Sequence, residues 1–258
     1  MKLKDKLEYH YRSFDRSKIE PDPLQFLHMF SDPKDIEAIG FLSSVFAYGN
    51  VAQIINTLNK VVRITGNLPY QFLLHFNIKK DFKRFDNLKH RFYSTTDIIR
   101  LFELLNEVYL NFSSLNNLFL FSFNNDEINV KNGITGFSNF FIESYRAKFG
   151  KPSRGITFMF PIPEKGSACK RMNLFLRWMV RKDELDFGIW NGILTSQLII
   201  PVDTHIASIC KRLRLTKRNN VSWQMAEEIT NNLKKYDLSD PVKYDFALCH
   251  IGMRKLKL

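Results

Sequence analysis

Apolar residues recur at helical spacing in nearly every informative window of this chain, and strict alternation of apolar and polar residues is rare. A period near 3.6 residues places an apolar stripe on one face of a helix, whereas a half-buried strand needs a period of two. The sequence therefore predicts an all-α protein. Its 258 residues, of which 45% are hydrophobic, can bury a substantial core in one large domain or two small lobes.

Local signals predict where several helices begin. Asp32 stands where an N-cap belongs and Pro33 occupies the first helical position, so we expect a helix from there to about Tyr48. A second helix is expected over residues 51–66. Its predicted buried face comprises Ile54, Leu58, Val61 and Val62.

Further helices are expected over residues 95–112, 134–150, 222–235 and 240–253. Ser222 and Asp240 are the predicted N-caps of the last two. The Asn-rich stretch over residues 123–133 is predicted to be a loop.

The chain is basic, with a formal net charge of +12 and a pI near 9.6. Clustered Lys and Arg residues gain affinity for polyanions because they release counterions from phosphates, so a nucleic-acid partner is favoured. The alternative is a compositional bias, since Lys, Asn, Ile and Phe are all abundant here, as an AT-rich coding sequence would make them.

Cys169, Cys210 and Cys249 are isolated from one another, which gives neither a disulfide framework nor a local metal-binding pair. The charged N-terminal stretch lacks the apolar core of a secretory signal, and the most apolar segment, residues 117–123, is too short to cross a bilayer. We expect a soluble protein in a reducing cytoplasm, without a membrane association.

The stretch "PEKGSACKRMNLFLRWM" predicts a turn that opens a helix near Ser167 or Ala168. One face of this helix is apolar, and the other is expected to be exposed and cationic. The apolar face comprises Met172, Phe175, Leu176 and Met179, and the other comprises Lys170, Asn173, Arg177 and Arg181. Amides at such a turn can bind phosphate, although the same pattern also makes an ordinary connection between helices.

Lys170 falls in the first turn of this helix. A helix N-terminus and the nearby Arg177 both disfavour an ammonium, so the pKa of Lys170 is expected to be lowered towards a neutral, nucleophilic amine. The plain alternative is a solvated lysine.

The stretch "LIIPVDTHIASICKRL" places Asp203 at the N-cap of another basic helix. Helix amides would keep its carboxylate ionised, which suits the stabilisation of a developing cation; the alternative is a purely structural cap. His205 is expected at the surface, and no suitably spaced partners give it a metal site.

In this order, the turn, the lysine and the "VDTH" segment resemble the helix-hairpin-helix superfamily of DNA glycosylases, which contains endonuclease III and the 8-oxoguanine glycosylases. "GSACKRMNLFLRWM" is similar to the second half of the family hairpin, and "VDTHIASICKRL" is similar to its aspartate segment. The whole of residues 158–252 looks like an uncharacterised bacterial family of that superfamily. The chain lacks the second glycine of the hairpin and the cluster-binding cysteines of endonuclease III. Its Lys-to-Asp spacing of 33 positions is nearest to that of the archaeal 8-oxoguanine branch.

The resemblance implies two helical lobes with a cleft between them. One lobe would comprise residues 31–182 and end in the hairpin, and the other would comprise residues 1–30 and 186–258. Lys170 and Asp203 would face each other across the cleft.

The resemblance also implies a DNA repair glycosylase that needs no cofactor or metal. Lys170 would attack the sugar of a flipped-out damaged nucleotide, with an oxidised purine as one candidate lesion, and Asp203 would stabilise the cationic sugar. A Schiff base at Lys170 would permit cleavage of an abasic strand. The expected partner is lesion-bearing duplex DNA, which places the protein on a bacterial nucleoid; no protein partner can be inferred. The expected DNA-binding residues are Lys165, Gly166, Ser167, Ala168, Arg177, Arg181, His205, Lys211 and Arg212.

A second hypothesis is a nucleic-acid-binding protein that has this fold without its chemistry. The altered hairpin and the absence of a recognisable lesion-pocket motif favour it, and a fold alone does not decide between them.

Overall fold

A computed structural model describes the backbone of residues 3–253 and the side chains of residues 3–249. Residues 1–2 and 254–258, which the expected second lobe includes, lie outside this range. Over the described residues the protein is built from α-helices and short 3-10 helices, and no β-strand forms; two isolated bridges join His90 to Tyr93 and Lys182 to Phe187. The prediction of an all-α protein is confirmed.

The contacts within the chain divide it into two compact units. Unit 1 comprises Met1–Ile19, Asn125–Lys131 and Ile162–Leu258, and unit 2 comprises Glu20–Asn124 and Asn132–Pro161. The division differs from the expected one, because the helix that carries Lys170 belongs with the Asp203 segment and not with the preceding bundle. Arg177 on that helix and Arg181 directly after it form ion pairs with aspartates of the same unit.

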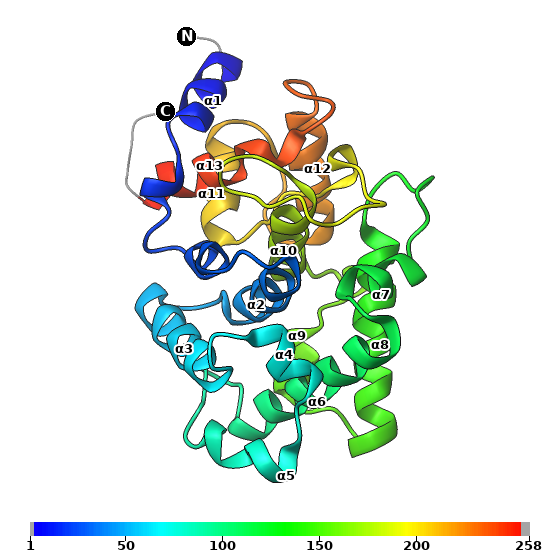
Figure 1. Ribbon diagram of the computed structural model, residues 1–258. Coiled ribbons are helices and arrows are strands. Elements are labelled where there is room, and N and C mark those ends of the chain that lie inside the picture. The colour runs from blue at the N-terminus through cyan, green and yellow to red at the C-terminus, as the bar shows by residue number, and fades with distance from the viewer. Residues whose placement is uncertain (1–2, 254–258) are drawn as a thin grey trace. The chain divides into compact units, whose positions relative to one another are not determined.

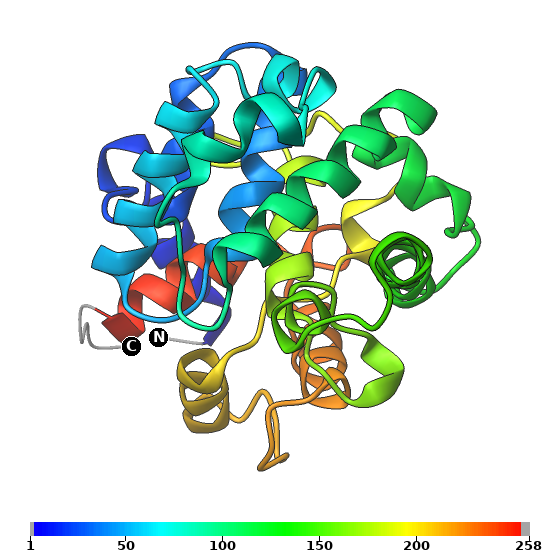
Figure 2. The same ribbon diagram turned by 90° about the horizontal axis from the view of Figure 1, so that it is seen from below.

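Unit 2 is a helical bundle around α2. Its α-helices are α2 (Pro33–Phe46), α3 (Val51–Ile64), α4 (Pro69–Leu74), α5 (Ile78–Asp81), α6 (Thr95–Phe112), α7 (Leu115–Phe121), α8 (Lys131–Phe149, whose first residue is in unit 1) and α9 (Arg154–Met159). Two 3-10 helices, η2 (Pro23–Met29) and η3 (Phe82–Phe85), complete it. Helix α2 packs against η2, α3 and α4, and α3 lies beside α2 in both views (Figures 1 and 2).

Aromatic side chains fill the core of unit 2. The Phe141 and Phe160 rings are stacked with centroids 4.3 Å apart, and Phe41 stacks on Phe141 at 6.0 Å. Nearly the whole of α2 is buried, which requires apolar residues on all its faces. The predicted buried face of α3 is confirmed, since all four of its residues are buried.

Unit 1 contains the candidate site. Its α-helices are α1 (Leu3–Arg12), α10 (Lys170–Val180), α11 (Thr204–Arg212), α12 (Trp223–Leu233) and α13 (Asp245–Met253). Its 3-10 helices are η1 (Arg16–Lys18), η4 (Pro163–Lys165), η5 (Thr195–Gln197) and η6 (Pro241–Tyr244). Helix α13 lies next to α11 (Figure 1) and also packs against α1. The 3-10 helix η6 packs against α12.

Of the N-caps predicted for α2, α12 and α13, two form and the third does not. Asp32 caps α2 by accepting from the Lys34 amide at 2.7 Å, and Ser222 caps α12, so both predictions are confirmed. The prediction for residues 240–253 needs correction: a 3-10 turn precedes α13, and Asp240 makes no capping hydrogen bond. Its carboxylate binds Arg181 instead.

Candidate functional site

Asp203 connects the start of α11 to the start of α10. Its Oδ1 accepts hydrogen bonds from the amides of His205 and Ile206, both at 2.9 Å, which is the geometry of an N-cap. Its Oδ2 lies 2.6 Å from Nζ of Lys170, the first residue of α10. Both side chains keep 33% of their surface exposed, so the pair is open to solvent on one side.

The two charges of this pair stabilise each other. Burial disfavours the Lys170 ammonium, but the surrounding negative charges, of which the Asp203 carboxylate is the strongest, together outweigh burial and raise the pKa of Lys170. Burial likewise opposes the Asp203 carboxylate, but Lys170 and the two α11 amides hold the pKa of Asp203 below its ordinary value. The expectation that the pKa of Lys170 is lowered is therefore wrong for this arrangement, because the Asp203 carboxylate stabilises the charged ammonium.

The turn before Lys170 contains two residues in the left-handed region, Gly166 with φ 85° and Cys169 with φ 47°. A left-handed Cys169 ends any helical run, so α10 begins at Lys170 and not at Ser167 or Ala168 as expected. The Cys169 amide donates to Ser167 Oγ at 3.2 Å. The side-chain amide of Asn173, which is buried and not on an exposed face, donates to Ala168 O at 3.1 Å and holds the turn closed.

Two backbone amides of this turn make no hydrogen bond within the described residues. No hydrogen bond within the described residues uses the amides of Ser167 and Ala168, whereas the Gly166 amide donates to Pro163 O within η4. The Ala168 side chain is buried, Gly166 and Ser167 are half-buried, and Lys165 is exposed beside them. The turn can therefore present two N–H groups and one ammonium to an anion.

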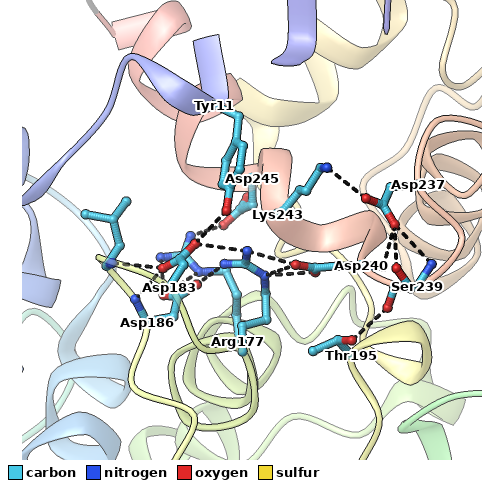
Figure 3. Close-up of polar contacts among 12 residues, drawn as sticks. Tyr11, Arg177, Asp183, Asp186, Thr195, Asp237, Ser239, Asp240, Lys243 and Asp245 are labelled. Carbon is cyan, nitrogen blue, oxygen red and sulfur yellow. Dashed lines mark hydrogen bonds and ion pairs between the residues drawn. The ribbon is translucent and has the colours of Figure 1, made fainter. Parts of the chain in front are cut away.

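Arg177 and Arg181 do not form the exposed cationic face that the sequence predicts. Each is only 3% exposed, and Figure 3 shows Arg177 among Asp183, Asp186, Asp240 and Asp245. Arg177 donates from Nε to Asp186 Oδ1 at 3.2 Å and from Nη1 to Asp245 Oδ2 at 2.5 Å. Both guanidinium groups are engaged inside unit 1, so assigning them to DNA phosphates is incorrect for this structure.

Arg181 is held by three carboxylates. Its Nε donates to both oxygens of Asp240 at 2.8 and 3.0 Å, its Nη2 donates to Asp183 at 3.0 Å, and its Nη1 donates to Asp186. Two guanidinium groups thus face four aspartates, and the network carries an excess of negative charge. Tyr11 closes it by donating to Asp183 at 3.2 Å (Figure 3).

Asp245 belongs to this network and also acts electrostatically on Lys170. Burial raises its pKa to about 6, although the guanidinium of Arg177 partly offsets the effect. Its charge is also one of those that raise the pKa of Lys170. Sequence reasoning did not single out Asp245; its place in "DPVKYDF", shortly after the cap candidate Asp240, was the available signal.

The remaining predicted cations lie on α11. His205 and Arg212 are exposed, and Lys211 is half-buried with Nζ donating to Asn219 O at 3.1 Å. The structure thus brings Lys170, Asp203 and His205 together at the start of α11, whereas Lys211 and Arg212 lie in its last turn.

Cys169 and Cys210 are buried cysteines of unit 1. Burial raises the pKa of Cys169 and of Cys210 to about 12, so both thiols stay protonated. Among the described residues, no group of three or more His, Cys, Asp or Glu side chains is placed to hold a metal ion. In the same part of the chain, no helix combines the length and the apolar character needed to span a membrane.

The site therefore defines an all-α protein in which a lysine and an aspartate meet at the N-termini of two helices. The chain belongs to the family described as "Protein of unknown function (DUF2400)", whose model matches residues 22–254. No curated protein and no solved structure matches the chain. Family membership therefore assigns no activity, and any function has to be argued from the site.

Proposed function

We propose that this protein is a DNA glycosylase that forms a Schiff base through Lys170. The observation that carries the proposal is the 2.6 Å contact between Lys170 Nζ and Asp203 Oδ2, at a carboxylate fixed by two helix amides. The resemblance to helix-hairpin-helix glycosylases pairs a lysine and an aspartate at these two positions. A helix cap alone would need no lysine beside it, and a lysine free in solvent would need no carboxylate 2.6 Å away.

The chemistry requires an amine and an anion on the same side of the sugar. Neutral Lys170 would attack the anomeric carbon, and the damaged base would leave with the electrons of the glycosidic bond and take up a proton. Asp203, which stays ionised because its pKa is lowered, would stabilise the positive charge that develops on the sugar. The sugar ring would then open: the C1′–O4′ bond breaks, the remaining amine proton moves to O4′, and a C1′–N double bond, the Schiff base, forms. In its protonated form this Schiff base permits strand cleavage through loss of a C2′ proton and departure of the 3′ phosphate.

The free amides of Ser167 and Ala168 would hold a phosphate of the damaged strand, with Lys165 beside them. His205, Lys211 and Arg212 would add contacts from α11. We retain these as proposed duplex contacts and exclude Arg177 and Arg181, because both are buried in ion pairs. A DNA substrate would place the protein on the nucleoid of a bacterium.

The second candidate is a nucleic-acid-binding protein without catalysis. The raised pKa of Lys170 favours it, since a lysine held as an ammonium is an ion-pair partner and not a nucleophile. Both candidates bind DNA, and only the first forms a covalent adduct.

Borohydride trapping on duplexes that carry an abasic site or 8-oxoguanine tests the proposal. We expect an adduct that Lys170→Gln abolishes while duplex affinity stays nearly unchanged. Lys131→Gln is the control, because Lys131 is another ion-paired lysine of unit 1, 3.9 Å from Glu164, and should leave the adduct intact. An adduct that persists in Lys170→Gln would contradict the assigned role. Intact duplex binding without any adduct would favour the second candidate, unless free base is still released.

A further inference from the structure

A cavity of about 460 Å³ lies in unit 2, between α3 and the segment that precedes α6. Helix α3 contributes Gln53, Asn56 and Lys60, and the segment contributes Lys89, Arg91 and Phe92. Gln53, Asn56 and Lys60 follow the spacing i, i+3, i+7, so they share one face of α3. This volume is within the range of small-ligand sites.

The lining of the cavity is cationic. Lys60, Lys89 and Arg91 are exposed basic residues, and no carboxylate is among the lining side chains. Within the described residues, none of the three forms an ion pair. Three cations around one concave polar surface repel one another unless an anion is present, so the cavity is suited to a phosphate-bearing ligand.

A buried histidine fixes the wall of the cavity. His90 is only 3% exposed; its Nδ1 lies 2.9 Å from Thr57 Oγ1, and its Nε2 lies 3.2 Å from the carbonyl oxygen of Tyr48. The Tyr48 hydroxyl in turn donates to the carbonyl of His90 at 3.0 Å. These bonds tie the segment to α3 and to Tyr48, which follows α2, so the backbone that carries Lys89 and Arg91 is held in place at His90.

Exposed aromatic rings lie beside the three basic residues of the cavity, and a second arginine, Arg154, lies near one of these rings. Arg91 has a φ of 54°, and its guanidinium lies over the rings of Tyr48 and Phe92, 5.4 and 5.7 Å from their centroids. Arg154 approaches the Phe92 ring at 5.4 Å. Phe92 remains 41% exposed and touches Phe158, which is 38% exposed, with centroids 5.1 Å apart. Exposed rings next to cations are the combination that binds bases of single-stranded nucleic acid.

We propose that this cavity binds one nucleotide unit of a nucleic-acid strand, with its phosphate on Lys60, Lys89 and Arg91 and its base on the Phe92 ring. The site is separate from the glycosylase chemistry, because every residue that forms it belongs to unit 2 and the assignment does not depend on Lys170. A free nucleotide has the same chemistry as a unit of a strand, and the experiment distinguishes these two sources.

Fluorescence anisotropy with a labelled oligothymidylate tests the proposal. We expect the double variant Lys60→Gln/Lys89→Gln to lower the affinity about tenfold at moderate salt and to reduce the salt dependence. The matched control is Lys79→Gln/Lys80→Gln, which removes two exposed lysines of α5 and should change the affinity less than about twofold. An equal loss in both double variants would mean unspecific attraction and would overturn the site.

A second variant tests the base contact. Phe92→Ala should weaken strand binding about fivefold or more, because base stacking on an aromatic ring is lost. Competition with thymidine monophosphate identifies the source: displacement that depends on Lys60 and Lys89 indicates a free nucleotide, and displacement only by an unlabelled strand indicates a strand. No dependence of strand binding on either variant would overturn the proposal. If Lys170→Gln still binds the strand, the nucleotide site in unit 2 is supported even if the glycosylase proposal fails.

Discussion

The two carboxylate oxygens of Asp203 serve different partners: Oδ1 caps α11, and Oδ2 lies 2.6 Å from Nζ of Lys170. One side chain thus positions a helix and sets the charge state of an amine. Asparagine retains an oxygen for the cap but carries no charge, so a substitution can separate the two roles.

Asp203→Asn should shift the formation of the Lys170 adduct to lower pH. The neutral amine is the nucleophile, and in the native protein the Asp203 carboxylate raises the pKa of Lys170, so adduct formation should increase with pH. Without that carboxylate, burial dominates and the pKa of Lys170 falls. The measurement is the yield of trapped adduct on an abasic-site duplex as a function of pH. Asp32→Asn changes another N-cap and should leave the profile in place; an unchanged profile in Asp203→Asn would show that Asp203 does not control the amine.

Asp203→Ala should destabilise the protein more than Asp203→Asn. Alanine loses the cap, which costs about 1 kcal/mol, whereas asparagine is as good a cap as aspartate. The ion pair with Lys170 is one-third exposed and contributes little on its own. Urea unfolding should therefore show a lower midpoint for the alanine variant at unchanged slope. Equal midpoints in the two variants would mean that the cap is not what stabilises α11.

Much of the fold follows from short-range sequence signals. The Asp32 and Ser222 caps, the buried face of α3 and the extent of α6 depend on spacing and on side chains a few residues apart. The two residues of the candidate site could also be predicted from the sequence, because Lys170 and Asp203 both lie where a helix is predicted to begin. Their 2.6 Å contact joins residues 33 positions apart, and it was inferred from a resemblance and not from any local pattern.

Long-range partners explain what could not be predicted. Arg177 and Arg181 share a polar helix face with Lys170, and on sequence alone such a face is most simply solvated. Their partners lie up to 68 positions away, on α13 and in the loop before it. A period shows which residues share a face, but not what covers that face. The cavity near Arg91 was missed for the same reason, because its two walls are far apart in the sequence.

Arg181→Met should be strongly destabilising and should not act on DNA binding directly. Removing the guanidinium leaves Asp183, Asp186 and Asp240 without a shared partner, and breaking a buried pair costs about 3–5 kcal/mol. Arg212→Met removes an exposed arginine and should change stability by less than about 0.5 kcal/mol. Thermal unfolding gives the first comparison, and duplex affinity of the folded fraction gives the second. We expect weaker binding only for Arg212→Met; the reverse pattern would return Arg181 to the DNA surface.

Asp245 should make the folded state more stable as the pH falls through about 6. Burial raises its pKa to about 6 from an ordinary value of 3.8, so the folded protein binds a proton that the unfolded chain does not bind between these values. Its contribution is therefore lost as the pH rises through 6. Asp245→Asn should remove this dependence, which is measured as the difference between the two proteins in urea midpoint across that range. If the urea midpoints of the two proteins change with pH by the same amount, Asp245 does not titrate in that range.

Gly166→Ala should weaken duplex binding through the shape of the turn. Gly166 has a φ of 85°, and an added Cβ would meet no atom within 4 Å, so the substitution introduces backbone strain of about 1–2 kcal/mol without a clash. Gly150 has a φ of 79° and the same open surroundings at the end of α8, which makes Gly150→Ala a matched control. Both variants should lose similar stability in urea unfolding. If the Ser167 and Ala168 amides hold a phosphate, only Gly166→Ala should lower duplex affinity, because only that turn positions those amides. Equal affinities in the two variants would remove the turn from the proposed DNA contacts and leave α11 as their main source.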